Sequence, residues 1–208
     1  MRNSYAFVVK TSLLYCILSA AFSLLSLFLE PRLPLPSPLL GFNVDEIGGH
    51  LLWGLAVGAV TCSIRYTIIA GTFAVLIDAD HLVSLTHLEA ISRMSHSIAF
   101  GVIALVVLMA LFGKRDYRLG AIAFAAVLSH ISFDIFDEDP WFPFFAPIYN
   151  SQVYFTHVDW IYFEIVAVAI VGIVTIFASK KVSKKLASSQ TRSSNEQIRS
   201  AFKPLIQM

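Results

Sequence analysis

The run LGAIAFAAVLSHISFDIF, residues 119–136, decides the fold class because it is long and apolar enough to cross a bilayer as a helix. Its far end carries His130 and Asp134, which a helix places on one face. Ionisable groups within a membrane are costly and usually functional. The run therefore predicts a transmembrane helix with a polar site near one end.

The whole chain has the composition of a polytopic membrane protein. Of its 208 residues, 57% are hydrophobic and 14% are charged, against about 45–50% and about 25% in ordinary soluble domains. The net charge of +1 gives no reason to expect a nucleic-acid partner. Cys16 and Cys62 lie inside apolar runs, which argues against a disulfide framework and against a cysteine-type zinc site.

Six apolar runs predict an all-α protein with about six transmembrane helices, forming a membrane domain over residues 1–179. A proline-rich stretch, residues 31–38, interrupts the chain after the first run. Residues 180–208 form a basic tail that we expect to be loosely ordered or to lie on the membrane surface. The runs cover residues 5–29, 49–64, 67–77, 96–112, 119–136 and 158–178.

The distribution of basic residues predicts the orientation. If six helices alternate across the membrane, thirteen of the fifteen lysines and arginines fall on one side, and only Arg32 and Arg93 fall on the other. Positive residues favour the cytoplasmic side, so both termini are expected there. The basic tail would then lie against the anionic inner leaflet of the cell membrane.

Five polar clusters fall at helix ends on the opposite, extracytoplasmic side. Counted at about 1.5 Å per residue, the first four clusters lie roughly 18–25 Å from the inner charges, within a hydrocarbon core about 30 Å thick. These four are therefore expected to share one layer. In chain order the clusters are His50; Asp78, Asp80 and His81; His96; His130 and Asp134; and His157 with Asp159.

Histidine and aspartate are ligands of zinc and related metals, so the first four clusters predict a metal site. On a continuing helix Asp78 and His81 share a face. Asp80 points elsewhere unless the helix unwinds at this position, so we expect it to bind a second ion or to orient a histidine. Ser95 is expected to cap the helix that His96 opens. The alternatives are acids facing water at a helix end, and a His–Asp hydrogen bond that only joins helices.

Seven candidate ligands exceed the need of one zinc ion, so we expect two or three ions sharing carboxylates. Such sites favour phosphoester hydrolysis. Asp80 and Glu164 are candidate catalytic groups, and Glu164, in the last helix, would either orient a metal ligand or transfer a proton. Arg93 either binds an anionic substrate oxygen or pairs with the surrounding acids, and His157 and Asp159 are further candidates for substrate binding. His87 and Glu89 are expected to be solvated.

The segment 137–155 concentrates aromatic residues and prolines. Aromatic side chains gather at membrane interfaces, so this segment is either a lid or re-entrant flap over the site or an ordinary aromatic belt. A lid this apolar would suit a lipid substrate that enters from the outer leaflet.

The order of these motifs resembles the YdjM-like inner-membrane metal-dependent hydrolases. The resemblance covers residues 48–147 and rests on Gly49-His50-Leu51-Leu52, Leu76-Ile77-Asp78-Ala79-Asp80-His81, Ser95-His96-Ser97 and Leu128-Ser129-His130-Ile131-x-x-Asp134. It implies that these histidines and aspartates bind metal. The family is in turn distantly similar to zinc phospholipases C and related nucleases, which implies a zinc-dependent phosphoesterase.

One departure from the family pattern stands out, because Ile91 and Ser92 occupy the positions where such proteins usually carry His-Arg. Arg93 or His87 would have to substitute. The leading hypothesis is a hydrolase acting on a phosphoester or lipid head group, with the lipid bilayer as its surroundings. The alternative is a transporter or metal-handling protein that uses the clusters as an ion site, but the inner halves of the helices offer no polar pathway.

Overall fold

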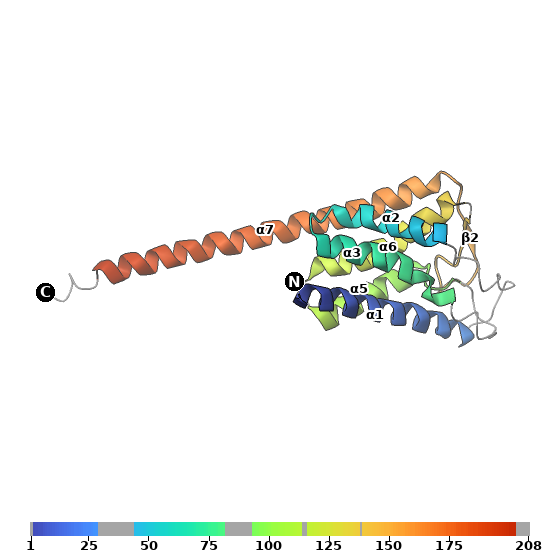
Figure 1. Cartoon of the computed structure of the whole chain (residues 1–208), viewed down its shortest axis with the longest axis horizontal. Helices are drawn as coiled ribbons and strands as arrows, with labels where there is room; N and C mark the ends of the chain where they lie inside the picture. The colour runs from blue at the N-terminus through green and yellow to red at the C-terminus, as the bar shows by residue number, and fades with distance from the viewer. Residues whose placement is uncertain (1, 29–43, 82–92, 114–115, 138, 203–208) are drawn as a thin grey trace.

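The computed structural model describes residues 2–28, 44–81, 93–113, 116–137 and 139–202, and it is mostly helical (Figure 1). Its α-helices correspond one by one to the six apolar runs, so the predicted helical membrane class is confirmed. Two short 3-10 helices, η1 (Leu25–Phe28) and η2 (Ile77–Asp80), and an antiparallel pair of two-residue strands, β1 (Trp141–Phe142) and β2 (Val153–Tyr154), complete the described elements. The α-helices are α1 (Arg2–Leu24), α2 (Val44–Ala59), α3 (Ile64–Leu76), α5 (Ile98–Phe112), α6 (Tyr117–Phe136) and α7 (Asp159–Phe202).

Three helical segments in the described part of the chain are long and apolar enough to cross a membrane: Ser4–Phe28, Tyr117–Phe136 and Asp159–Lys181. The helices α2, α3 and α5 are shorter, with 16, 13 and 15 residues. The described α-helices run alongside one another in one bundle, and α7 extends far beyond the ends of the others (Figure 1).

The central helix of the bundle is α6, which packs against α2, α3, α5 and α7. Its many alanines are buried, and small side chains allow neighbouring helices to approach closely. The hydroxyl of Tyr15 on α1 donates a hydrogen bond to the carbonyl of Ala123 at 3.0 Å. The Tyr15 ring also stacks on Phe73 of α3, with centroids 4.1 Å apart, so α1 contacts both α6 and α3 through this one side chain.

The end of α3 tightens into η2, and this change positions the acidic cluster. A 3-10 helix has about three residues per turn, which brings residues three apart into line. Two serines hold the segment in place, because Ser19 and Ser95 both donate hydrogen bonds to the carbonyl of Ile77, at 2.6 and 3.2 Å. Asp78 and His81 therefore lie on one side.

Three local predictions differ from the structure. α2 begins at Val44, so His50 lies well inside the helix rather than at its start. Ser97, not Ser95, caps α5 by accepting a hydrogen bond from the Phe100 amide at 3.2 Å, so His96 precedes the helix. The backbone of the tail is helical as far as Phe202 rather than loosely ordered, while its position on the membrane surface stays a prediction. The residues 31–38, 87, 89, 91 and 92 considered above lie outside the described residues.

Close packing of α2 on α3 depends on Gly54. A Cβ atom at this position would lie 2.6 Å from the carbonyl oxygen of Ala70 and 2.7 Å from the Ala74 methyl group. We expect Gly54→Ala to lower the stability by about 1–3 kcal/mol, because the backbone of α3 cannot yield as a flexible side chain would. Thermal unfolding in detergent, followed by circular dichroism, measures the effect.

Gly48→Ala is the matched control on the same helix, since a Cβ atom there has no neighbour within 4 Å. Alanine is the better helix former, so this variant should be unchanged or slightly more stable. Equal melting temperatures for the two variants would contradict the close-packing interpretation.

Candidate metal centre

The structure brings all seven predicted ligands into one buried cluster, which is built from two helices, one 3-10 helix and a turn. α2 supplies one histidine, η2 and the residue after it supply two aspartates and a histidine, the turn before α5 supplies a histidine, and α6 supplies the last pair. Each side chain is at least nine-tenths buried. The cluster consists of His50, Asp78, Asp80, His81, His96, His130 and Asp134.

The cluster divides into three overlapping groups whose donor atoms could each hold a metal ion. The groups are His50, His130 and Asp134; Asp78, His96 and His130; and Asp78, Asp80 and His81. Within each group the donor atoms lie within 4.8 Å of one another. Asp78 and His130 each belong to two groups, so adjacent ions would share them.

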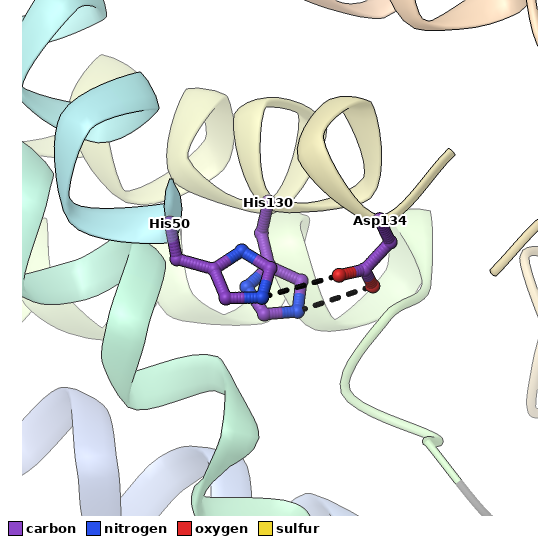
Figure 2. Close-up of side chains that lie close together, drawn as sticks. All are labelled: His50, His130 and Asp134. Carbon is purple, nitrogen blue, oxygen red and sulfur yellow. Dashed lines mark ion pairs between the residues drawn. The ribbon is translucent and has the colours of Figure 1, made fainter. Parts of the chain in front are cut away.

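The first group is open to view in Figure 2. The imidazole rings of His50 and His130 lie one over the other, with centroids 3.8 Å apart and an angle of 8° between the planes. Both direct a nitrogen at Asp134: His50 Nε2 lies 3.2 Å from Oδ1, and His130 Nε2 lies 3.4 Å from Oδ2. Two helices, α2 and α6, thus present three donors to one point.

The second group is centred on two histidine nitrogens that face each other. His96 Nε2 and His130 Nε2 are 2.7 Å apart. The Oδ1 atom of Asp78 lies 3.3 Å from the His130 nitrogen and 3.7 Å from the His96 nitrogen. Three donors from η2, from the turn before α5 and from α6 therefore converge.

The other ring nitrogens of these two histidines have partners that orient them. His130 Nδ1 lies 2.6 Å from the carbonyl oxygen of Ala74, which can only accept, so Nδ1 carries a hydrogen and donates it. In a neutral imidazole this leaves the lone pair on Nε2, inside the cluster. His96 Nδ1 lies 3.2 Å from Oδ2 of Asp80. Histidines that bind metals are typically oriented by such carbonyl and carboxylate partners.

Electrostatics also favours a cation here. Three carboxylates of the cluster are buried beside one guanidinium, that of Arg93, which leaves two negative charges uncompensated if the imidazoles are neutral. Uncompensated buried charge is costly, and a divalent ion would balance it.

The donor spacing fits a tetrahedral ion. Two nitrogen or oxygen ligands of one zinc ion lie about 3.3 Å apart, given bond lengths of about 2.0–2.1 Å. Four donor pairs in the first two groups lie between 3.2 and 3.7 Å, whereas the facing nitrogens of His96 and His130 are closer, at 2.7 Å. Oδ1 of Asp80 is buried, has no hydrogen-bond partner among the described residues and lies 3.8 Å from His81 Nε2, so it is available to bind a cation.

Arg93 borders the cluster in an unusual conformation. Its φ of 59° lies in the left-handed region, and its side chain is buried. The guanidinium forms ion pairs with both Asp134 and Asp139 and lies 4.6 Å from the centroid of the Phe142 ring. Of the two sequence-based alternatives, pairing with acids is the arrangement that this structure contains.

Two residues near the cluster escaped the sequence analysis. Asp139 shares Arg93 with Asp134, and the only available signal was its place in the acidic stretch after α6. Phe142 of β1 is fully buried and lies parallel to the His96 ring, with centroids 5.9 Å apart. The aromatic segment therefore packs on the cluster through Phe142. The sequence gives no sign that this phenylalanine, rather than another aromatic residue of the segment, lies next to the cluster.

Three predicted residues lie apart from the three groups. Glu164 belongs to none of the groups, and its Oε2 is buried without a hydrogen-bond partner among the described residues. The ring of His157 stacks on Phe136, with centroids 6.2 Å apart. Asp159 accepts hydrogen bonds from the Thr156 amide and hydroxyl at 2.6 and 2.8 Å, a local contact at the start of α7. Their catalytic and substrate-binding roles stay predictions.

Comparison with known proteins identifies one family. The family model described as YdjM inner membrane protein matches residues 45–195, well over half of the chain and including all seven cluster residues. No curated protein matches the chain, and neither does any solved structure.

The cluster predicts that the purified protein contains a divalent metal in stoichiometric amounts. His130→Ala should lower the metal content at least tenfold, because this residue serves two of the three groups. Elemental analysis of protein purified without chelator measures the content. His157→Ala is the matched control, since His157 belongs to none of the groups and should leave the metal content unchanged. Metal-free protein that also acquires none on soaking would contradict the prediction.

Proposed function

The chain belongs to the family of YdjM inner membrane proteins, and from this premise we propose that it is a membrane-embedded, metal-dependent hydrolase acting on a phosphoester. One observation carries the proposal: four histidines and three aspartates are buried together with a single guanidinium. A helix bundle gains no packing advantage from burying so many polar groups, so the arrangement favours a catalytic site over a structural one.

Zinc is the ion that this donor set favours, because imidazole and carboxylate ligands at tetrahedral spacing suit it. Two or three ions are consistent with three groups that share Asp78 and His130. When bound, such ions supply a hydroxide at neutral pH and stabilise the attacking and leaving oxygens of a phosphoester.

The protein's own residues would hold and orient the reacting groups. His50, His130 and Asp134 form one ligand set, and the Ala74 carbonyl keeps His130 in the tautomer that binds. Asp80 accepts a hydrogen bond from Ser95 and lies beside His96, so we assign it the role of orienting that histidine. Glu164 has no step in this proposal, because it belongs to none of the three donor groups.

Arg93 is the group suited to bind a phosphate oxygen of the substrate. It is the one described cation beside the cluster, and guanidinium binds phosphate in a planar, bidentate geometry. One of its two partners, Asp139, has a side chain that is 63% exposed. A phosphate could therefore take the place of Asp139 on the guanidinium without any change at Asp134.

The membrane topology that we propose has about six spans, both termini in the cytoplasm and the site near the extracytoplasmic side of the inner membrane. The excess of basic residues at the opposite helix ends supports this orientation. The short helices α2, α3 and α5 pack around α6, so they would be shielded from water by the bundle and the bilayer together. A site at this level would meet substrate molecules in the extracytoplasmic leaflet, which suits a lipid or head-group substrate.

The aromatic segment supports a lipid substrate for a second reason. Phe142 packs on His96, while Phe144 lines an entirely apolar pocket of about 260 Å³ with Ile98 and Leu128. The amide of Ile98 donates a hydrogen bond to the Phe144 carbonyl at 3.1 Å, which ties the segment to the start of α5. Apolar surface thus comes close to the polar cluster, as binding of a molecule with both a phosphate and an acyl chain requires.

Hydrolysis of a phosphoester substrate panel, including phospholipids, tests the proposal. We expect activity that chelator removes and added zinc restores, and at least a hundredfold loss in Asp78→Asn, because this change removes a charged ligand that two groups share. Ser4→Ala, on the exposed surface of α1, is the control and should retain full activity. Metal uptake into proteoliposomes without hydrolysis of any substrate would contradict the proposal and favour a transporter.

The role of Arg93 makes a separate prediction. Arg93→Gln should raise KM for a phosphoester about ten- to a hundredfold while the metal content is unchanged, because the variant loses the phosphate partner and keeps every ligand. Asp139→Asn should instead leave KM unchanged or lower it, since a competing carboxylate is removed. An unaltered KM in Arg93→Gln would show that the guanidinium only pairs with the acids.

A further inference from the structure

A second site lies at the opposite end of the bundle from the metal cluster. A pocket of about 610 Å³ opens between the start of α6 and the middle of α7. Its wall is mostly apolar, and Tyr117 closes it from the α6 side. The α7 residues Val174, Phe177, Ala178 and Lys181 recur at helical spacing, so they form one continuous face. Lys180 completes the lining.

The polar rim of the pocket is cationic. Lys180 and Lys181 are exposed, and Lys181 Nζ lies 5.4 Å from the centroid of the Tyr117 ring. Neither lysine forms an ion pair with any residue in the described part of the chain. Asp116, the acidic residue beside Tyr117, is already engaged, because its carboxylate accepts hydrogen bonds from the Tyr66 hydroxyl at 2.7 and 2.8 Å.

Arg118 adds a third cation next to the rim. Its Nη2 donates a hydrogen bond to the Ser179 hydroxyl at 2.8 Å, which joins α6 to α7 beside the pocket. Its Nε is buried and has no hydrogen-bond partner among the described residues. Two lysines therefore line the apolar pocket, and Arg118, which follows Tyr117 in α6, adds a guanidinium with an unused donor.

The pocket lies where a lipid head group meets the hydrocarbon core. Lys181 is the last residue of the candidate span Asp159–Lys181, and Tyr117 is the first of the span Tyr117–Phe136. Counted along α6, Tyr117 is about 20 Å from His130. An amphipathic ligand at this level meets apolar side chains towards the membrane centre and lysines towards the surface.

We propose that this pocket binds one anionic phospholipid, with an acyl chain against Val174, Phe177 and Ala178 and the head-group phosphate beside Lys180 and Lys181. Charge complementarity selects the ligand, because Lys180, Lys181 and the adjacent Arg118 form no ion pair with an acid in the described part of the chain and so favour an anionic head group over a zwitterionic one. The site does not depend on the metal cluster or on hydrolysis.

Native mass spectrometry of the purified full-length protein tests this site. Phosphatidylglycerol and phosphatidylcholine with identical acyl chains are titrated separately. We expect one phosphatidylglycerol to bind tightly and phosphatidylcholine to bind weakly. Lys181→Gln should weaken phosphatidylglycerol binding about fivefold, as expected for one basic residue near an anionic head group. Lys10→Gln, an identical charge change at an exposed position on α1, should have no effect.

A second pair of variants tests the apolar wall. Phe177→Ala should weaken the binding of phosphatidylglycerol, whereas Ile176→Ala should not, because the neighbouring Ile176 is exposed but does not line the pocket. Equal affinity for the two lipids, or equal losses in Lys181→Gln and Lys10→Gln, would overturn the proposal. Binding that survives both Lys181→Gln and Phe177→Ala would place the lipid elsewhere and overturn it as well.

Discussion

The imidazole of His130 is the point on which the packing and the polar cluster both depend. Through Nδ1 it donates a hydrogen bond to the Ala74 carbonyl at 2.6 Å, which joins α6 to α3. Through Nε2 it faces His96, Asp78 and Asp134. The same contact therefore sets the distance between two helices and directs a lone pair into the cluster. Displacing the ring would break this hydrogen bond and leave three donors without their common partner.

Small residues bring the other donors within reach of this ring. Gly49 lies against the Phe133 ring, where an added Cβ would come within 1.9 Å of a ring carbon. Gly54 and Gly58 let α2 approach the backbone of α3 in the same way. This close approach places His50, the neighbour of Gly49, in parallel contact with His130. The glycines before and after this histidine thus serve the geometry of the cluster as well as the packing.

The two ends of α6 differ in charge: acidic side chains dominate at one end and basic side chains at the other. At one end, carboxylates outnumber the single guanidinium. At the other, Arg118 and the lysines of α7 surround an apolar pocket without acidic partners among the described residues. A bilayer imposes such a division, because charges are tolerated only near its surfaces or in a protected site. A divalent ion at one end and an anionic lipid at the other would each complete the local charge balance.

Much of the fold and of the cluster follows from the sequence, because hydropathy and helical spacing are local properties. The six apolar runs became the six described α-helices, and counting residues from the inner charges placed His50, Asp78, His96 and His130 in one layer. Family membership was likewise apparent from the order of short motifs.

Only the tertiary structure decided how each helix is rotated and where it ends, since these depend on packing between segments far apart in the chain. Hence Glu164 lies outside the three donor groups, although its depth in the last helix favoured a catalytic role. Asp80 turns towards His96 because η2 tightens at a point held by two serines, and Arg93 meets Asp139 because the chain after α6 folds back over the site. The spacing of residues along the chain identifies the candidate ligands, whereas the rotation of each helix determines which residues they contact.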